Sequence, residues 1–481
     1  MECRSRFPLR RRALALGLAA AFGLASVDAA AHVSQPGLHL LPDWLGQRAR
    51  PSGTIIVVEN CNDSGPGSLR DAIANASGDT VIDLDSLTCS TITLTTGALT
   101  IDPPGTPTTT LQRSAAYYNG AKVPTLEISA GHVSRVIDHE GAGGLYLDGV
   151  ELRDGTYAGT KGGCVYSNGP LFLDAVVVRF CELDAPGSAD ALGGGIYAKS
   201  ALNMNFSTIT SSHARSDSGY TYGGGIFAAY GLGAFYSTIE ANVAYGVGYG
   251  GGVAARGGVL IEASDVESNG AQYDGGLALF GGSTIAHALE IADSTVALNV
   301  GQGNVGGIEA DAKLYLYNST IAFNSGGANR ASGVVLNGAS VLSMYSTIVA
   351  RNTANGSPSD ISGASTIVGS HNLVIASSTT LPGDTITSDP ALGPMADNGG
   401  QTRTMALLAG SPAINAGNNI LNEVCDQRSG RFSYYDGFIV KYPRVVGANA
   451  DIGAFETGAD DEIFPNGFDG PPLLPQHCFR R

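Results

Sequence analysis

Three acidic side chains stand at corresponding places in two copies of a repeated motif near the middle of the 481-residue chain. Glu240 ends the segment STIE at 237–240, and Asp265 and Glu267 belong to the next copy, SDVE at 264–267. If these copies are strands of adjacent coils about 4.8 Å apart, the three carboxyl groups lie together on an outer face. Such neighbours raise one another's pKa, which suits acid and base catalysis, or they share a cation such as calcium. Glu240, Asp265 and Glu267 are therefore the candidate catalytic residues of a polysaccharide lyase or glycoside hydrolase. A solvated acidic surface without chemistry is the alternative interpretation.

Aromatic side chains gather along one edge of the same repeats. Tyrosines occur in the segments that precede three consecutive glycine pairs, and two further aromatic residues follow such pairs at positions expected to point outward. Aromatic rings with a polar tip are suited to stacking on sugar rings. The candidate ligand-binding residues are Tyr197, Phe227, Tyr245 and Tyr249. Tyrosines that only pack over a corner of the fold are the alternative.

Other chemistry is not indicated by the motifs. The chain has no G-x-x-x-x-G-K-[ST], HExxH or GxSxG segment, and its eight histidines show no convincing ligand spacing. The glycine-rich segment YGVGYGGGV at 245–253 is predicted to open a strand rather than a helix, so it lacks the geometry of a phosphate loop. We therefore expect no metal site built from histidine or cysteine and no organic cofactor.

Two interleaved series of short motifs must position these residues. A pair of small residues followed by an apolar residue recurs every 24 to 32 residues, and a motif of the type STI falls between successive copies. The first series is GGCVYS at 162, GGIYAK at 194, GGIFAA at 224, GGVAAR at 251, GGLALF at 275, GGIEAD at 306 and SGVVLN at 332. The second is STIT at 207, STIE at 237, SDVE at 264, STVA at 294, STIA at 319 and STIV at 346. Each unit holds three short strand-like stretches and cannot bury its own apolar face, so units must stack. The prediction is an all-β fold, a right-handed parallel β-helix.

Strand alternation assigns the side chains to two faces. Two columns of apolar residues are predicted to point into the core. The first holds Cys164, Ile196, Ile226, Val253, Leu277, Ile308 and Val334, and the second holds Ile209, Ile239, Val266, Val296, Ile321 and Ile348. The glycines are interpreted as positions that need a positive φ. A recurring asparagine (Asn242, Asn269, Asn299, Asn324, Asn352) is interpreted as a left-handed corner residue.

The ends of the chain predict export and capping. Residues 1–31 have the arginine-rich start, short apolar core and small-residue end of a signal peptide. The further divisions are a linker at 32–53, a β-helix at 54–376 with an N-terminal cap at 54–85 and its clearest repeats at 162–352, a C-terminal capping region at 377–457 and a tail at 458–481. Within the cap, Ser68 and Asp71 predict the start of a short helix.

Three segments also resemble a known group of proteins. They are IVVENCNDSGPGSLRDAIANASGDTVIDL from Ile56, DPALGPMADNGGQTRTMALLAGSPAINAGNN from Asp389, and DIGAFE from Asp451. Together with the GGI and STI repeats they are similar to bacterial right-handed parallel β-helix proteins of the choice-of-anchor Q type, over most of residues 54–456. The resemblance implies an exported, often surface-associated protein and does not imply a reaction.

Charge and cysteines limit the partners. The net charge of −16 becomes about −19 once the leader is removed, and such a surface repels nucleic acid. Six cysteines remain, and an even number in an exported chain predicts disulfides, for which we expect the local pairs Cys61/Cys89, Cys164/Cys181 and Cys425/Cys478. No later segment is long and apolar enough to span a membrane. The leading prediction is a secreted or cell-surface monomer that binds a carbohydrate or cell-surface ligand as an adhesion or display scaffold, and the lyase or hydrolase is the alternative.

Overall fold

The computed structural model describes residues 53–428 and 442–458, apart from 104, 119–120, 282–287, 328–329, 331 and 339. All of them belong to one compact unit of the chain, 41–481. The predicted signal peptide, almost all of the predicted linker and the predicted tail beyond residue 458 lie outside the described residues. In the part of the chain that is described, no helix has the length and apolar character needed to cross a membrane.

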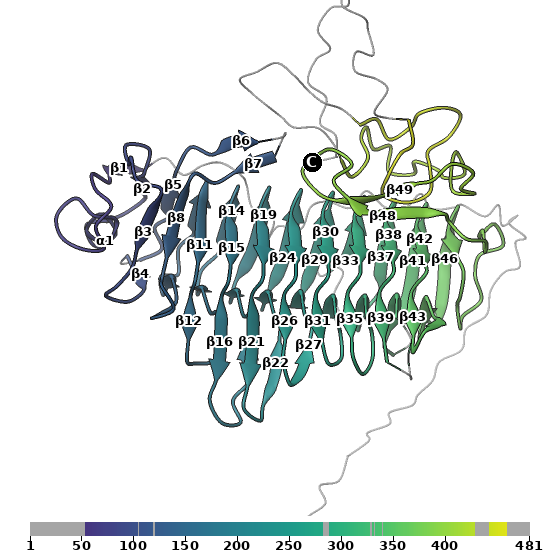
Figure 1. Cartoon of the computed structure of the whole chain (residues 1–481), viewed down its shortest axis with the longest axis horizontal. Helices are drawn as coiled ribbons and strands as arrows, with labels where there is room; N and C mark the ends of the chain where they lie inside the picture. Colours follow the sequence, from purple (N-terminus) through teal and green to yellow (C-terminus); the bar gives the residue numbers. More distant parts are fainter. Residues whose placement is uncertain are drawn as a thin grey trace, which may run out of the picture. The chain divides into compact units, whose positions relative to one another are not determined.

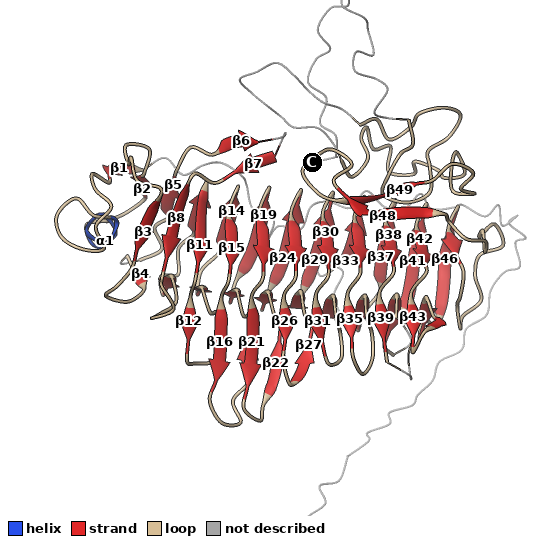
Figure 2. Cartoon of the chain, in the orientation of Figure 1, coloured by secondary structure: helices blue, strands red, loops and turns tan. Residues whose placement is uncertain are grey.

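Four long sheets of parallel strands form a right-handed β-helix of about 11 turns, as the sequence predicts (Figures 1 and 2). We letter them A, B, E and C, in the order in which a coil enters them. Sheet A contains β1 (Thr54–Val57), β2 (Thr80–Asp83), β5 (Thr109–Gln112), β10 (Leu145–Asp148), β14 (Leu171–Asp174), β19 (Ala201–Asn205), β24 (Gly231–Phe235), β29 (Gly258–Glu262), β33 (Leu289–Ala292), β37 (Leu314–Tyr317), β41 (Val341–Tyr345) and β46 (Thr366–Ser370). Sheet B contains β3 (Thr91–Thr93), β8 (Leu126–Ser129), β11 (Val150–Arg153), β15 (Val177–Arg179), β20 (Thr208–Thr210), β25 (Thr238–Glu240), β30 (Asp265–Glu267), β34 (Thr295–Ala297), β38 (Thr320–Ala322), β42 (Ile348–Ala350) and β47 (Leu373–Val374).

The remaining strands complete the coils and cover parts of them. Sheet E contains β12 (Thr156–Tyr157), β16 (Glu182–Ala185), β21 (His213–Ser216), β26 (Val243–Ala244), β31 (Gly270–Ala271), β35 (Val300–Gly301), β39 (Ser325–Gly326), β43 (Thr353–Ala354) and, antiparallel to it, β44 (Ser357–Pro358). Sheet C contains β4 (Leu99–Ile101), β9 (Ile137–His139), β13 (Val165–Ser167), β18 (Ile196–Ala198), β23 (Ile226–Ala228), β28 (Val253–Arg256), β32 (Leu277–Phe280), β36 (Ile308–Ala310), β40 (Val334–Leu336) and β45 (Ile361–Ser362). A small outer sheet, sheet F, contains β17 (Ala191–Leu192), β22 (Tyr220–Tyr222) and β27 (Val247–Tyr249). Two hairpins, β6 (Ala116–Tyr118) with β7 (Ala121–Val123) and β48 (Leu392–Ala396) with β49 (Thr404–Leu407), stand outside the coils.

The strand count per coil corrects the sequence analysis. Three strands per coil were expected, but many coils have a fourth, in sheet E, and three also contribute to sheet F. The segment AYGVGY at 244–249, which precedes the glycine pair at 251, holds the end of β26 and all of β27. These strands are only two to four residues long, so their alternation is hard to distinguish from loop sequence.

The interior columns follow the predicted alternation except at the first residue of the first column and the last residue of the second. Val165, not Cys164, pairs with Ile196, and Ile348 pairs with Thr320, so that Val349 takes the inward position. Ile348 points outward and is buried in a second cluster with Leu407 and Ile452 of the C-terminal region. Each core side chain of this size contributes about 1.5–3 kcal/mol through burial.

The recurring asparagines form a ladder through the interior. Each is almost fully buried, and each donates its backbone N–H and its Nδ2 to the Oδ1 of the residue in the next coil, for example Asn269 to Asn299 at 3.0 Å for both bonds. The positive φ that was assigned to them belongs instead to the residue before each one, such as Ala241 and Ser268. The prediction of left-handed asparagines was therefore wrong. The residue before each asparagine makes the left-handed turn, and the asparagine side chain supplies hydrogen bonds inside the buried corner.

The glycine pairs are required by close packing more than by φ. A Cβ on Gly225 would lie 2.9 Å from the side chain of Asn242, and one on Gly224 would lie 2.3 Å from the carbonyl carbon of Val243. The left-handed glycine is usually the one that precedes such a pair, for example Gly223 with φ 72°, and in the first copy it is Gly162 with φ 62°. A side chain at either member of the pair would push the coil away from the asparagine ladder.

Both ends of the β-helix are covered. At the N-terminal side, α1 (Leu69–Ala74) starts where predicted, and the Oγ of Ser68 accepts a hydrogen bond from the backbone N–H of Asp71 at 3.2 Å. At the other side, bridges join Ile361 to Ser377 and Leu373 to Ile386, so residues 377–386 extend the last coil. The rest of the C-terminal region packs on the outer face of sheet B, where Met395 and Met405 contact Ala297 and Ala322.

Candidate functional site

The three predicted acids lie together, as the repeat spacing predicts. Strands β25 and β30 are neighbours in sheet B, with Thr238 opposite Asp265 and Glu240 opposite Glu267. The C-terminal region reaches this point, because Nη1 of Arg403 lies 2.6 Å from Oε1 of Glu267 and 4.0 Å from Oε2 of Glu240. The acids therefore lie at one of the contacts between this region and the β-helix.

Only one of the three acids remains substantially open to solvent. The side chain of Glu240 is 31% exposed and that of Glu267 is 1% exposed, while Asp265 is fully buried. Oδ1 of Asp265 accepts a hydrogen bond from Thr238 Oγ1 at 2.7 Å. Burial raises the pKa of Asp265 well above its ordinary value and also raises the pKa of Glu267, which Arg403 opposes. In this structure Asp265 and Glu267 are closed to a substrate, so an open cleft containing all three acids is not present.

The predicted aromatic surface is partly covered. Tyr197 and Phe227 point outward from sheet C, as expected, but are only 6% and 2% exposed because sheet F packs over them. The prediction that these two residues form an accessible ligand surface was wrong, since the segment that covers them is itself a set of strands. The ring of Tyr249 stacks against Tyr222, with centroids 5.4 Å apart, and against Tyr273 at 4.7 Å. Tyr245, in contrast, is 49% exposed.

Tyr245 borders a surface cavity on sheet E. The cavity has a volume of about 260 Å³ and is lined by Glu182, Asp184, His213, Arg215 and Tyr245. Strand β16 supplies the two carboxylates, β21 supplies the histidine and the arginine, and Tyr245 directly follows β26. In register, Glu182 lies opposite His213 and Asp184 lies opposite Arg215.

The cavity is polar, and contacts hold Glu182, His213 and Tyr245 in place. An imidazole nitrogen of His213, Nε2, lies 2.8 Å from Oε1 of Glu182, and Thr156 Oγ1 donates to Oε2 of Glu182 at 3.5 Å. The ring of Tyr245 meets the ring of His213 edge-on, with centroids 5.6 Å apart. Carboxylates accept hydrogen bonds, a guanidinium donates several in a fixed plane, and a tyrosine ring offers an apolar face. This combination fits a ligand with several hydroxyl groups on a compact ring.

Four of these five residues were missed in the sequence because three strands per coil were expected and their strands, β16 and β21, belong to the fourth sheet. A signal is present nonetheless. The segments CELDA, SHARS and NVAYG, from Cys181, Ser212 and Asn242, align on the ladder position, and in each the second and fourth residues point outward. Aligning the repeats on the ladder residue instead of on glycine would have placed Glu182, His213 and Tyr245 on one surface.

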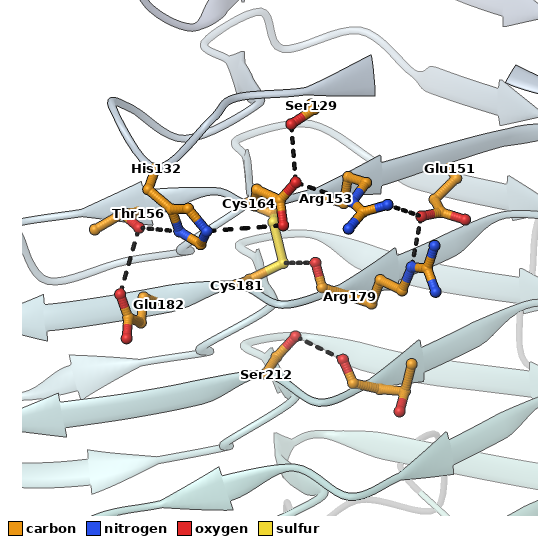
Figure 3. Close-up of a disulfide and its surroundings, with 12 residues drawn as sticks. Ser129, His132, Glu151, Arg153, Thr156, Cys164, Arg179, Cys181, Glu182 and Ser212 are labelled. Carbon is orange, nitrogen blue, oxygen red and sulfur yellow. Dashed lines mark hydrogen bonds and ion pairs between the residues drawn. A yellow bond between two sulfur atoms is a disulfide. The ribbon is translucent and has the colours of Figure 1, made fainter. Parts of the chain in front are cut away.

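A disulfide fixes the start of this surface. Cys164 and Cys181 are bonded to each other, as predicted, and Cys181 directly precedes β16 (Figure 3). Cys164 replaces the second glycine of the pair, and Cys181 occupies the ladder position, where Ser212 and Asn242 follow in the next coils. The bond thus joins the ladder position to the glycine-pair position that faces it within one coil, where Gly225 faces Asn242 two coils later. Cys61 and Cys89 are also bonded as predicted. Cys425 is disulfide-bonded, while its predicted partner Cys478 lies outside the described residues.

A Cys164→Ser/Cys181→Ser variant is expected to lose about 3 kcal/mol of unfolding free energy, since the bond closes a short loop whose freedom increases in the unfolded chain. It should also speed hydrogen exchange at Glu182–Ala185. Chemical denaturation and exchange measured by mass spectrometry test both effects. A Cys61→Ser/Cys89→Ser variant is the control and should be destabilised without faster exchange in β16, whereas equal exchange in both variants would contradict a local role.

A pair of neighbouring carboxyl groups beside sheet C was also missed in the sequence. Asp274 is buried beside Glu309 on the outer side of sheet C, and the two side chains share a hydrogen bond. Arg330 Nη1 lies 2.6 Å from Glu309 Oε1, and Asn337 donates to Glu309 and to Asp311. Because its Oε1 is bonded by Arg330 and Asn337 and it also bonds Asp274, Glu309 holds sheet C and the neighbouring corner together. Among the described residues, no group of three or more histidine, cysteine, aspartate or glutamate side chains could hold a metal ion.

The fold and the site define a parallel β-helix protein with a polar surface cavity and a docked C-terminal region. No protein-family model matches the chain, and no curated protein matches it. Among solved structures, it is similar to the pectate lyase Pel9A, with 14% sequence identity and a TM-score of 0.48 over 84% of this chain and 97% of that chain. The resemblance to choice-of-anchor Q proteins stays a prediction.

Proposed function

We propose that the protein is an exported β-helix scaffold, of the choice-of-anchor Q type, that binds carbohydrate at the sheet E cavity. The observation that carries the proposal is the convergence of two carboxylates, an imidazole, a guanidinium and an exposed tyrosine on one cavity. Concave sites with a few well-placed polar groups are the usual form of small-ligand sites. Each polar group can bond a sugar hydroxyl, and the ring of Tyr245 can cover the apolar face of the sugar.

The disulfides and the predicted leader support export, since such bonds persist in oxidising surroundings. Export, monomeric state and attachment to a cell surface remain part of the proposal. The alternative, a polysaccharide lyase or glycoside hydrolase using Glu240, Asp265 and Glu267, has less support, because two of these acids are enclosed by the C-terminal region. Release of unsaturated products or new reducing ends from polysaccharides by the purified protein would favour that alternative.

Tyr245→Ala and Arg215→Ala are each expected to weaken binding at least tenfold. The purified chain is first screened on a glycan array, and the strongest glycan is then measured by calorimetry against both variants. Tyr230→Ala is the matched control, because Tyr230 is 50% exposed but does not line the cavity. If the control weakens binding as much as Tyr245→Ala, or if neither cavity variant changes it, the cavity is not the binding site. Repeating the array with calcium or a chelator tests the predicted cation.

A further inference from the structure

The C-terminal region docks on sheet B through an interface that contains many buried charged groups. From the β-helix come Asp265, Glu267 and Asp293, and from the C-terminal region come Asp426, Asp451, Glu456, Arg403, Arg428 and Arg444. All of these except Arg403 are at most 1% exposed. Six carboxyls therefore meet three arginines in a largely water-free interface.

The acids of the C-terminal region are supplied with hydrogen-bond donors, which oppose the effect of burial; burial still raises the pKa of Glu456 to about 7 and the pKa of Asp426 above its ordinary value. Glu456 accepts the backbone N–H groups of Val446 and Asp451 at 2.8 Å each, and Asp426 accepts from Arg428 at 2.6 Å. Asp451 accepts from the backbone N–H groups of Asn415 and Thr457. Arg428 pairs with Asp426 and Arg444 lies near Glu456, while Arg403 pairs with Glu267 and Glu240 of the β-helix.

The acids contributed by the β-helix are less well supplied. Oδ2 of Asp265, Oε2 of Glu267 and both side-chain oxygens of Asp293 are buried and have no hydrogen-bond partner. The nearest cation to Asp293 is Arg444, with Nη1 at 3.9 Å from Oδ1. A buried carboxylate without donors is strongly disfavoured, whereas a protonated carboxyl in the same place is tolerated.

We propose that Asp265 and Asp293 make docking of the C-terminal region proton-linked, so that the region is held closed at acidic pH and opens more readily as the pH rises past neutral. Closing then takes up protons, and opening releases them. Opening would uncover Glu240, Glu267 and the apolar strip of sheet B that includes Ala297, Ala322 and Ile348.

The direction follows from the neighbours of each acid. Burial raises the pKa of Asp293 to about 7; Arg444 and the side-chain amide of Asn318 oppose the rise, and Asp426 adds to it. Burial raises the pKa of Asp265 well above its ordinary value, with Glu267 and Glu240 adding to the rise and Thr238 and Arg403 opposing it. In the open state both acids return toward about 4. Below about pH 4 both acids are protonated in the docked and the open state, so protonation does not affect the free energy of docking. As the pH rises through 7, the docked state must lose or retain these protons at a cost, and docking weakens.

Hydrogen exchange of the full-length protein between pH 5 and 8, corrected for intrinsic exchange, tests the proposal. Protection of Leu392–Ala396 and Thr404–Leu407 should fall at least tenfold across this range, while strands β19 and β24 keep theirs. Asp265→Asn and Asp293→Asn, which mimic the protonated acids, should each reduce the pH dependence and increase protection at pH 8, and the double variant should remove the dependence. Glu290→Gln is the control, because burial raises the pKa of Glu290 to about 7 on β33 of sheet A, and it should leave the dependence in place.

Protection that is independent of pH in the unaltered protein overturns the proposal. So does a pH dependence that persists in the Asp265→Asn/Asp293→Asn double variant. Loss of protection at every pH in both single variants also overturns it, because neutral side chains of the same shape are expected to dock better. If only one variant fails to fold, as shown by exchange throughout the β-helix, the other one decides.

Discussion

Asn269→Ala is expected to destabilise the protein by about 3–5 kcal/mol. Oδ1 of Asn269 accepts from the backbone N–H of Asn242 at 3.0 Å and from its Nδ2 at 3.1 Å, and Nδ2 of Asn269 donates to the carbonyl of Ile239 at 2.9 Å. The variant leaves two buried donors and two acceptors short of a partner. Each such group costs about 1–3 kcal/mol, and relaxation of the corner recovers part of the loss.

The loss is measured as a shift of the denaturation midpoint, with exchange at neighbouring corners as the local readout. Asn168→Ala is the matched control, since Asn168 makes comparable bonds to Glu140 and Lys199 at a more exposed corner. The control should lose about 1 kcal/mol or less. Equal losses in both variants would mean that the ladder adds no stability beyond an ordinary side-chain hydrogen bond.

The parts of the fold that the sequence predicted are those encoded by one residue and its immediate neighbours. A column such as Ile209, Ile239 and Val266 can be recognised because strand alternation and the coil repeat act on each position alone. The same holds for the adjacency of Glu240 and Glu267, which follows from equal positions in successive copies. Errors of one residue at Cys164 and Ile348 arose where a repeat departs from its consensus.

What covers the outer faces could not be predicted in this way. Tyr197 and Phe227 have the composition of an outward position, and nothing adjacent in sequence shows that sheet F covers them. The contact between Arg403 and Glu267 spans 136 residues, so it depends on where the C-terminal region docks. The cavity on sheet E was missed for a different reason, because its strands are short and Glu182 and His213 look like loop residues. Local patterns therefore determined the coils, and the roles of the outward residues depended on long-range packing.

Arg428→Met is expected to weaken the C-terminal region by about 3–5 kcal/mol, because it leaves Asp426 buried without its cation. Arg428 is fully buried, donates to Oδ2 of Asp426 at 2.6 Å and to the carbonyl of Glu456 at 2.7 Å, and lies over the ring of Phe455 at 3.8 Å. Methionine keeps much of the apolar contact, so the loss reports mainly the missing charge and hydrogen bonds.

The loss should depend on pH. Burial raises the pKa of Asp426, and Arg428 opposes that rise, so the pKa climbs further in the variant. Asp426 then takes up a proton below its new pKa, and the destabilisation should be smaller at pH 5 than at pH 8. Unfolding monitored by denaturant and by exchange of Thr404–Leu407 at both pH values measures this difference. A loss that is the same at pH 5 and pH 8 would contradict the electrostatic origin.

Two further variants separate burial from charge pairing. Arg351→Ala removes an exposed ion pair to Asp389, in which both side chains are 49% exposed, and should cost about 0–1 kcal/mol. Asp426→Leu in the Arg428→Met background should recover part of the loss, because an apolar pair in a buried site no longer needs a partner for the carboxylate. The expected order of stability is then the unaltered chain and Arg351→Ala together, the double variant below them, and Arg428→Met lowest. That order follows because the main cost is a buried Asp426 carboxylate without its partner, and replacing Arg428 alone leaves that carboxylate buried.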